Sequence, residues 1–140
     1  MNWLLDTCVL SEYVSRRPSP AVVAWLDLQD ENGLFISVIS LGEIEKGIIK
    51  LRAVDARRAQ KLSVWFGHLE RRFTDRTLAM DRPVMGAWAA LSADAEAAGR
   101  KLPLMDGFLM ATAQCRGLTI VTRNVRDFAR YPQVFNPWTL

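Results

Sequence analysis

Four acidic side chains are the residues of this chain whose types and spacing best suit chemistry. They are Asp6, Glu43, Asp106 and Asp127. Asp6 ends a short apolar run, Glu43 and Asp106 each fall in the first turn of a predicted helix, and Asp127 follows a run rich in β-branched residues. In an open parallel α/β sheet, ligands bind outside the carboxyl ends of the strands, next to helix N-termini. The sequence therefore predicts that the four carboxylates meet at one edge of a sheet.

Each of the four acids also has a purely structural explanation. Ser40 and Glu43 fit the capping box, in which the glutamate bonds the backbone N–H of the cap residue. An acid in the first turn of a helix, such as Asp106, is stabilised by the helix dipole without any ligand. Asp6 and Asp127 can each cap the segment that follows. Taken singly, every one of these carboxylates can be structural.

The set as a whole is harder to explain by capping. Several neighbouring carboxylates repel one another, and some take up protons unless a cation lies between them. Oxygen ligands suit Mg²⁺, or Mn²⁺ as a substitute, rather than Zn²⁺. Such a cation activates water for attack on a phosphodiester. The sequence contains no Gly-rich phosphate loop, so it does not indicate chemistry on nucleoside triphosphates.

No Cys/His cluster competes with the acids as a metal site. The single histidine, His68, falls in a basic helix and is interpreted as a surface or helix-flank residue. The two cysteines, Cys8 and Cys115, do not form a C-x-x-C pair and are interpreted as small buried side chains.

Basic residues are concentrated in two parts of the chain. The net charge is +3, and Lys and Arg cluster between residues 46 and 76 and again between 116 and 130. A solvated helix face explains this pattern, and so does a surface that follows a phosphate backbone. The candidates for nucleic-acid contacts are Lys46, Lys50, Arg123 and Arg126.

Apolar runs of strand length alternate with segments of helical spacing. Strands are predicted over 2–5, 34–38, 77–80 and 118–122, with a short final strand within 134–138. Helices are predicted over 9–14, 21–30, 40–51, 55–72, 81–98 and 105–116. Strands that are apolar on both faces and separated by helices indicate a parallel sheet covered on both sides. We expect one α/β domain over residues 1–140 with a central parallel sheet of four to five strands.

The chain has no apolar run near the roughly 20 residues needed to span a bilayer. Asp6 interrupts the apolar stretch near the N-terminus, and no basic segment precedes it. We therefore expect a cytoplasmic protein without a membrane partner.

Four motifs in order resemble the VapC-type PIN-domain toxins of type II toxin–antitoxin systems. They are Leu5-Asp6-Thr7-x-Val9-Leu10-Ser11-Glu12, Ser40-x-x-Glu43-Ile44-x-x-Gly47-Ile48, the segment around Asp106, and Thr122-Arg123-Asn124-x-x-Asp127-Phe128. The ending Asn136-Pro137-Trp138 is similar to the FitB-like branch. The resemblance implies a three-layer α/β/α fold and Mg²⁺-dependent cleavage of RNA. It also implies a homodimer and a cognate antitoxin, a small DNA-binding protein through which the toxin reaches DNA.

The resemblance assigns roles to particular residues. The implied catalytic acids and metal ligands are Asp6, Asp106, Glu43 and Asp127. Asn124 can take the place of Asp127 as the fourth ligand, and Thr7 and Thr122 are implied accessory residues. Cys8 stands where the family often has a polar residue, and we expect little functional cost because it lies beyond the metal acid.

Two other functions compete with the nuclease. A non-catalytic module acting through an antitoxin-type partner and DNA is suggested by the basic helix 55–72. It predicts that charge reversal at Arg57, Arg58 and Lys61 abolishes function while variants of the acids keep it. A phosphatase of the haloacid dehalogenase type would need Asp-x-Asp, and position 8 is Cys. A phospho-receiver domain needs paired acids before its nucleophile strand, which the residues before Asp6 do not supply.

Overall fold

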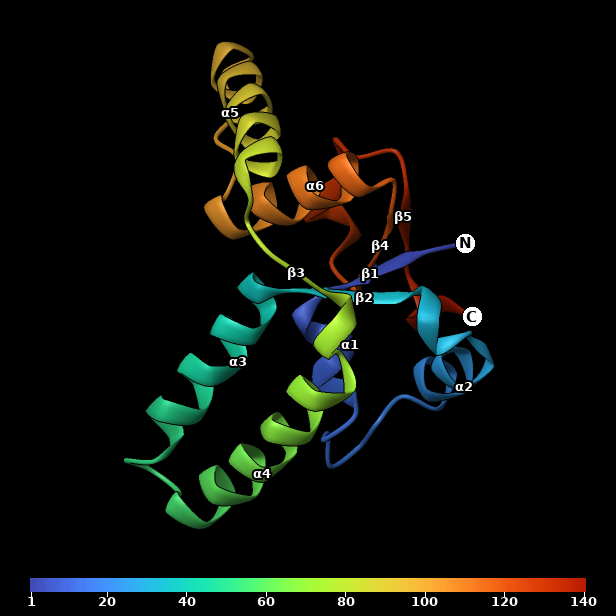
Figure 1. Cartoon of the computed structure of the whole chain (residues 1–140), viewed down its shortest axis with the longest axis vertical. Coiled ribbons are helices and arrows are strands. Elements are labelled where there is room, and N and C mark those ends of the chain that lie inside the picture. The colour runs from blue at the N-terminus through green and yellow to red at the C-terminus, as the bar shows by residue number, and fades with distance from the viewer.

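Five parallel strands form the central sheet of the computed structural model, which describes residues 1–140 (Figure 1). The strands are β1 (Trp3–Leu5), β2 (Leu34–Ser37), β3 (Thr77–Leu78), β4 (Thr119–Val121) and β5 (Val134–Phe135). Their order in the sheet is β3–β2–β1–β4–β5. The direction of winding reverses between β1 and β4, where Leu5 pairs with Val121. Ligands of open α/β sheets bind at the carboxyl ends of the strands beside such a reversal.

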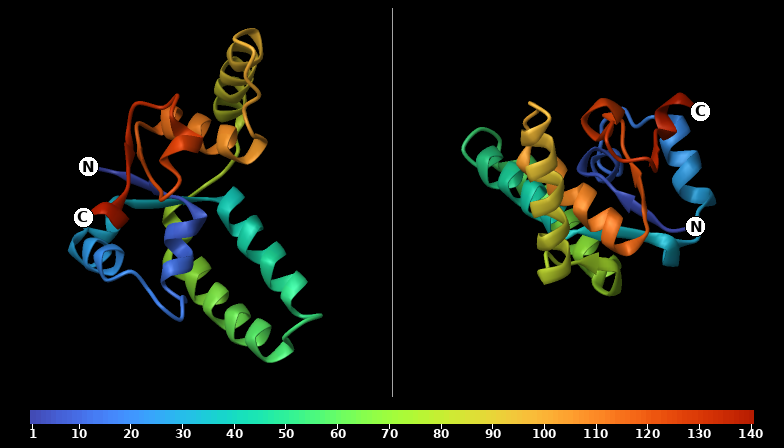
Figure 2. Two further views of the ribbon diagram at one scale, coloured as in Figure 1. Left: turned by 180° about the vertical axis from the view of Figure 1, so that it is seen from behind. Right: turned by 90° about the horizontal axis from the view of Figure 1, so that it is seen from above.

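Helices cover both faces of the sheet. They are α1 (Thr7–Glu12), α2 (Pro20–Leu28), α3 (Val38–Leu51), α4 (Ala56–Arg72), α5 (Arg82–Ala97) and α6 (Leu104–Arg116). Helices α5 and α6 lie on one side of the sheet, and α1, α2 and α4 lie on the other (Figure 1, Figure 2). Helix α3 packs along α4, and the two extend away from the sheet as a hairpin. The predicted α/β/α arrangement is confirmed. None of the helices combines the length and apolar character needed to cross a bilayer.

Alternate residues of the central strands pack against opposite helical layers. Leu5 and Val121 belong to the core that also contains buried side chains of α1, α2 and α4. Leu4 and Ile120, next to them in the sequence, belong to a second core built against α6. Because successive side chains of a strand point to opposite faces, strands of three residues supply both cores. This explains why β1 and β4 are continuously apolar.

The start of α3 differs from the prediction. Ser37 ends β2 and caps the helix, because its Oγ accepts a hydrogen bond from the Ile39 N–H at 3.0 Å. Ser40 consequently lies inside the helix, fully buried, and its hydroxyl has no hydrogen-bond partner. The predicted capping box of Ser40 and Glu43 is therefore wrong. Glu43 lies in the second turn of α3 rather than the first.

The two ends of the chain pack together beside α2. The ring centroid of Trp3 lies 5.0 Å from that of Trp25 and 5.6 Å from that of Phe135. A short helical turn, Pro137–Thr139, follows β5 and also packs against α2. The final strand predicted within 134–138 is thus confined to its first two residues, which pair with β4 at the edge of the sheet.

Candidate active site

Asp6 lies at the carboxyl end of β1 and is held there by two hydrogen bonds. The Thr7 N–H donates to Asp6 Oδ1 at 2.8 Å, and the Thr122 hydroxyl donates to Oδ2 at 2.8 Å. Thr122 directly follows β4, is fully buried, and accepts a hydrogen bond from the Asn124 N–H at 3.0 Å. Asp6 therefore caps α1, as its structural explanation predicted. Its second oxygen is fixed by a residue 116 positions away.

Thr122→Val is expected to lower the free energy of unfolding by about 1–3 kcal/mol. The change keeps the volume of the side chain but removes a buried donor and acceptor, so Asp6 Oδ2 and the Asn124 N–H both lose the Thr122 hydroxyl. Equilibrium unfolding in urea measures the effect. Thr122→Ser keeps the hydroxyl and should lose only about 0.8 kcal/mol for the missing methyl group. Equal losses in the two variants would mean that the hydroxyl does not stabilise this corner of the fold.

Glu43 reaches the same edge from α3. Its side chain is exposed, and its Oε1 accepts a hydrogen bond from the Thr7 hydroxyl at 2.9 Å. Thr7 thus contacts Asp6 through its backbone and Glu43 through its side chain. This pair of contacts joins the first turn of α1 to the second turn of α3. The accessory position predicted for Thr7 lies between two of the four acids.

Asp106 lies in the first turn of α6 and is half-buried. It is not the cap of this helix, which begins after Pro103. Burial of the carboxyl raises the pKa of Asp106 from 3.8 to about 6, and the negative charges of Asp127, Asp6 and Glu43 add to this effect. Asp106 therefore lies within the electrostatic field of the three other predicted acids.

Asp127 belongs to a short 3-10 helix, Val125–Phe128, that follows β4. Its side chain is exposed, and the cap position of this turn belongs to Asn124. Asn124 makes no side-chain capping bond, but its backbone N–H is bound by Thr122. Both residues are consequently anchored to the same corner as Asp6. Which of them completes a metal site stays a prediction.

The four acids are near enough to influence one another electrostatically, but they do not form a coordination sphere. No three Asp, Glu, Cys or His side chains stand close enough together to hold a metal ion between them. Charge repulsion acts over longer distances than coordination, so the raised pKa of Asp106 is compatible with this spacing. The chemistry of the donor set suits a hard cation, because all four side chains are carboxylates and a divalent ion would relieve their repulsion. The assignment of the four acids as ligands stays a prediction.

Cys8 contributes to the site, which the sequence analysis did not foresee. Its Sγ lies 3.7 Å from Asp6 Oδ2 and 3.7 Å from Thr122 Oγ1. Burial, together with the charge of Asp6, raises the pKa of this thiol, which keeps it protonated at neutral pH. The prediction that both cysteines are buried is wrong, since Cys8 is half-buried and Cys115 is exposed. The available signal was the position of Cys8 two residues after a strand-end acid.

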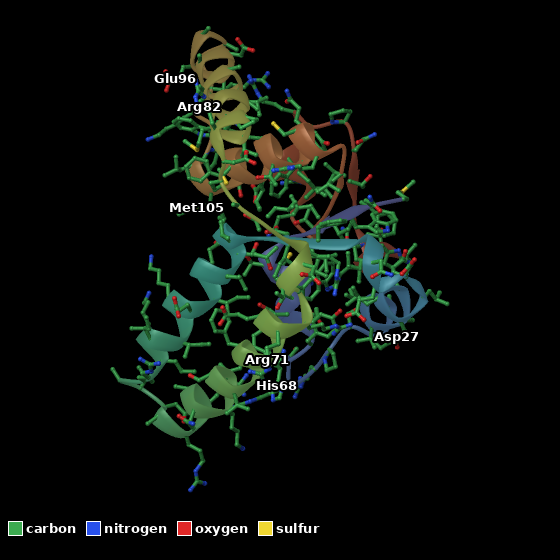
Figure 3. The ribbon with its side chains drawn as sticks, in the orientation of Figure 1. Asp27, His68, Arg71, Arg82, Glu96 and Met105 are labelled. Atoms are coloured by element: carbon green, nitrogen blue, oxygen red, sulfur yellow. The ribbon has the colours of Figure 1, made fainter.

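Two of the predicted nucleic-acid contacts lie beside the acids. Lys46 and Glu43 line a cavity of about 360 Å³ between α3 and the start of α6, where Met105 also lies (Figure 3). Arg126 and Asp127 line a second cavity, of about 230 Å³, together with Met110 of α6. A basic side chain and a carboxylate thus share each cavity.

The other two predicted contacts have different surroundings. The guanidinium of Arg123 lies 5.6 Å from the ring centroid of Trp138, in a cation–π arrangement. Lys50 is exposed in the last turn of α3 and lines neither cavity. Arg123 therefore already has a partner within the chain, and Lys50 lies two turns along the helix from Glu43.

Comparison with known proteins places this geometry in a family. Residues 3–134 match the PIN domain family. The chain is 34% identical over 140 residues to Toxin FitB of Neisseria gonorrhoeae, covering 96% of this chain and 97% of the relative. It is 32% identical over 136 residues to VapC ribonuclease Y4jK of Sinorhizobium fredii, covering 96% of both. A chain in the structure of FitAB bound to an IR36 DNA fragment superposes with a TM-score of 0.89 at 31% identity, over 99% of this chain and 96% of that one. Sequence and fold agree that the chain belongs to the PIN-domain family.

Proposed function

We propose that this chain is a Mg²⁺-dependent endoribonuclease and the toxin of a type II toxin–antitoxin pair. The observation that carries the proposal is the set of four carboxylates at the carboxyl edge of the sheet, whose mutual repulsion contributes to a pKa of about 6 for Asp106. Relatives named as a toxin and as a ribonuclease support it. Mg²⁺ is the proposed ion, and Mn²⁺ its substitute, because both suit sites built only of oxygen ligands.

The proposed roles of the residues follow from their contacts. Asp6 offers a carboxylate that two hydrogen bonds already fix, so little ordering remains when substrate arrives. Thr7 keeps Glu43 turned toward the same edge. Asp106 carries the charge that is most costly without a cation, and it therefore gains most when one binds. A divalent cation bound by these carboxylates would supply an acidified water and would neutralise charge on the phosphoryl oxygens.

Cleavage of RNA by the purified chain, free of antitoxin, tests the proposal. A labelled single-stranded or looped RNA should be cut in Mg²⁺ or Mn²⁺, left intact in EDTA, and cut again when excess Mg²⁺ is restored. A single-stranded DNA of the same sequence is the matched control for an RNA-specific reaction. RNA that stays intact with both metals would refute the enzymatic proposal and favour a binding module that acts through a partner.

We further propose that the chain forms a homodimer and binds a cognate antitoxin that carries the DNA-binding domain. The similar chain of known structure belongs to a FitAB complex bound to a DNA fragment. The chain itself would then contact RNA at its acids and DNA only through the antitoxin, in the cytoplasm. Co-expression with the product of the neighbouring gene, followed by measurement of the mass of the complex, tests this pairing.

A further inference from the structure

Four basic side chains surround the cavity that contains Asp127. They are Arg100, Lys101, Arg126 and Arg130. The first two come from the segment between α5 and α6, and the other two come from the turn after β4 and the residues just beyond it. The apolar side chains of Leu102 and Met110 also line the cavity, whose volume is about 230 Å³. Two segments that are distant in the sequence therefore bring positive charge to one hollow.

These four cations have no partner within the chain. The ion pairs of the structure join Arg72 and Arg76 to Glu31, and Arg116 to Asp81. None of the four basic side chains that line the hollow makes a side-chain hydrogen bond, and all four residues are exposed. The carboxylate that shares the hollow with them is Asp127, a predicted member of the acid cluster. Their charge is thus available to a ligand at the border of the candidate active site.

The positive charge of the hollow counteracts the electrostatic repulsion between the acids and a nucleic acid. A polyanion that approaches four carboxylates is repelled over the Debye length, which is about 8 Å at physiological salt. Unpaired cations beside Asp127 offset this repulsion locally. Phosphate contacts of this kind position a nucleic acid without reading its sequence. Single-stranded RNA suits the hollow better than a duplex, because its backbone can bend into a short concave surface.

We propose that Arg100, Lys101, Arg126 and Arg130 form a phosphate-binding patch, which holds the backbone of single-stranded RNA next to the bond to be cut. The inference rests on the proposed ribonuclease function and adds to it the surface that positions the substrate. Two of its members, Arg100 and Lys101, lie outside both basic clusters that the sequence pointed to. They act as positioning residues, because they contact phosphates away from the reacting atoms.

A matched pair of triple variants tests the patch. In the first, Arg100, Lys101 and Arg130 are replaced by alanine. In the second, Arg52, Arg57 and Lys61 are replaced by alanine, which removes the same charge from exposed positions on the α3–α4 hairpin, across the sheet from α5 and α6 (Figure 1). Binding of a fluorescent 12-nucleotide single-stranded RNA is measured in EDTA at several salt concentrations, so that the result does not depend on cleavage.

The patch variant should bind this RNA on the order of tenfold or more weakly at 0.1 M salt. The slope of log K against log salt should fall by about 2, because each phosphate contact on a single strand contributes about 0.7. The control variant should keep the wild-type slope. Circular dichroism and thermal unfolding verify that both variants fold.

Several results would overturn the inference. One is an equal loss of RNA affinity in the two variants. Another is an unchanged slope of log K against log salt in the patch variant. The third is a wild-type chain that does not bind the RNA. Loss of binding to the antitoxin, with RNA binding intact, would also overturn it and assign the surface to a protein partner. RNA binding through the patch without cleavage in Mg²⁺ or Mn²⁺ would leave the patch standing and refute the ribonuclease proposal, so the two failures are distinguishable.

Discussion

Asp6→Asn is expected to reduce RNA cleavage by a factor on the order of 10³ or more, with little loss of stability. The asparagine oxygen can still accept the Thr7 N–H, and the amide N–H can donate to the Thr122 oxygen in place of the hydrogen bond that Oδ2 now accepts, so the fold should be kept. The variant also removes the negative charge that we propose for cation binding. Initial rates on a labelled RNA in Mg²⁺ measure the loss, and thermal unfolding verifies the fold.

Asp94→Asn is the matched control for this substitution, because Asp94 is an exposed acid on α5 outside the candidate active site. It should cleave RNA at the wild-type rate. In a growth assay, expression of Asp6→Asn should be harmless while Asp94→Asn stays toxic. Residual cleavage within tenfold of wild type in Asp6→Asn would contradict the role assigned to this carboxylate.

Asp106→Asn is expected to abolish cleavage and, at the same time, to stabilise the metal-free protein above pH 6. The pKa of Asp106 is 3.8 in its ordinary state and about 6 in the fold, so the folded protein binds more protons than the unfolded chain between these values. Stability therefore falls as the pH rises through this window. The full shift corresponds to about 3 kcal/mol. Since the side chain is only half-buried, screening by solvent reduces the expected effect to about 1 kcal/mol.

Urea unfolding in EDTA at pH 5 and pH 7.5 measures this pH dependence of the free energy of unfolding. The wild type should lose more stability than Asp106→Asn between the two pH values, and Asp94→Asn should behave like the wild type. Mg²⁺ should raise the melting temperature of the wild type more at pH 7.5 than at pH 5, because protons compete with the cation for Asp106. An Asp106→Asn variant no more stable than the wild type at pH 7.5 would show that burial and the neighbouring acids do not destabilise the Asp106 carboxylate in the fold.

The fold was predictable from the sequence because its strands are short and buried on both faces. Leu4 and Leu5, or Ile120 and Val121, pack in opposite cores, and this produces continuous apolar runs that are typical of a parallel sheet covered on both faces. The start of α3 was not predictable from the same pattern. Ser37 and Ser40 both offer a hydroxyl for capping, and the choice depends on where β2 ends, which is fixed by its pairing with neighbouring strands.

The acids of the site were predictable from the sequence, but the contacts that hold them in place, and two of the basic residues beside them, were not. Strand-end positions pointed to Asp6, whereas the hydrogen bond from Thr122 depends on the pairing of β1 with β4. Arg100 and Lys101 lie between the predicted helices 81–98 and 105–116, and nothing local in the sequence relates them to the turn after β4. Their approach to Arg126 is a result of tertiary packing, which spacing along the chain does not encode.

The hydrogen bond between Asp6 and Thr122 has a consequence for the synthesis of the protein. The first strand made, β1, sits in the middle of the sheet, and its neighbour β4 is among the last segments to leave the ribosome. Pairings between such distant segments form late in folding. A chain whose translation stops before residue 122 lacks the hydrogen bond that the Thr122 hydroxyl donates to Asp6 Oδ2. The corner that holds Asp6 is therefore completed only when almost the whole chain has been made.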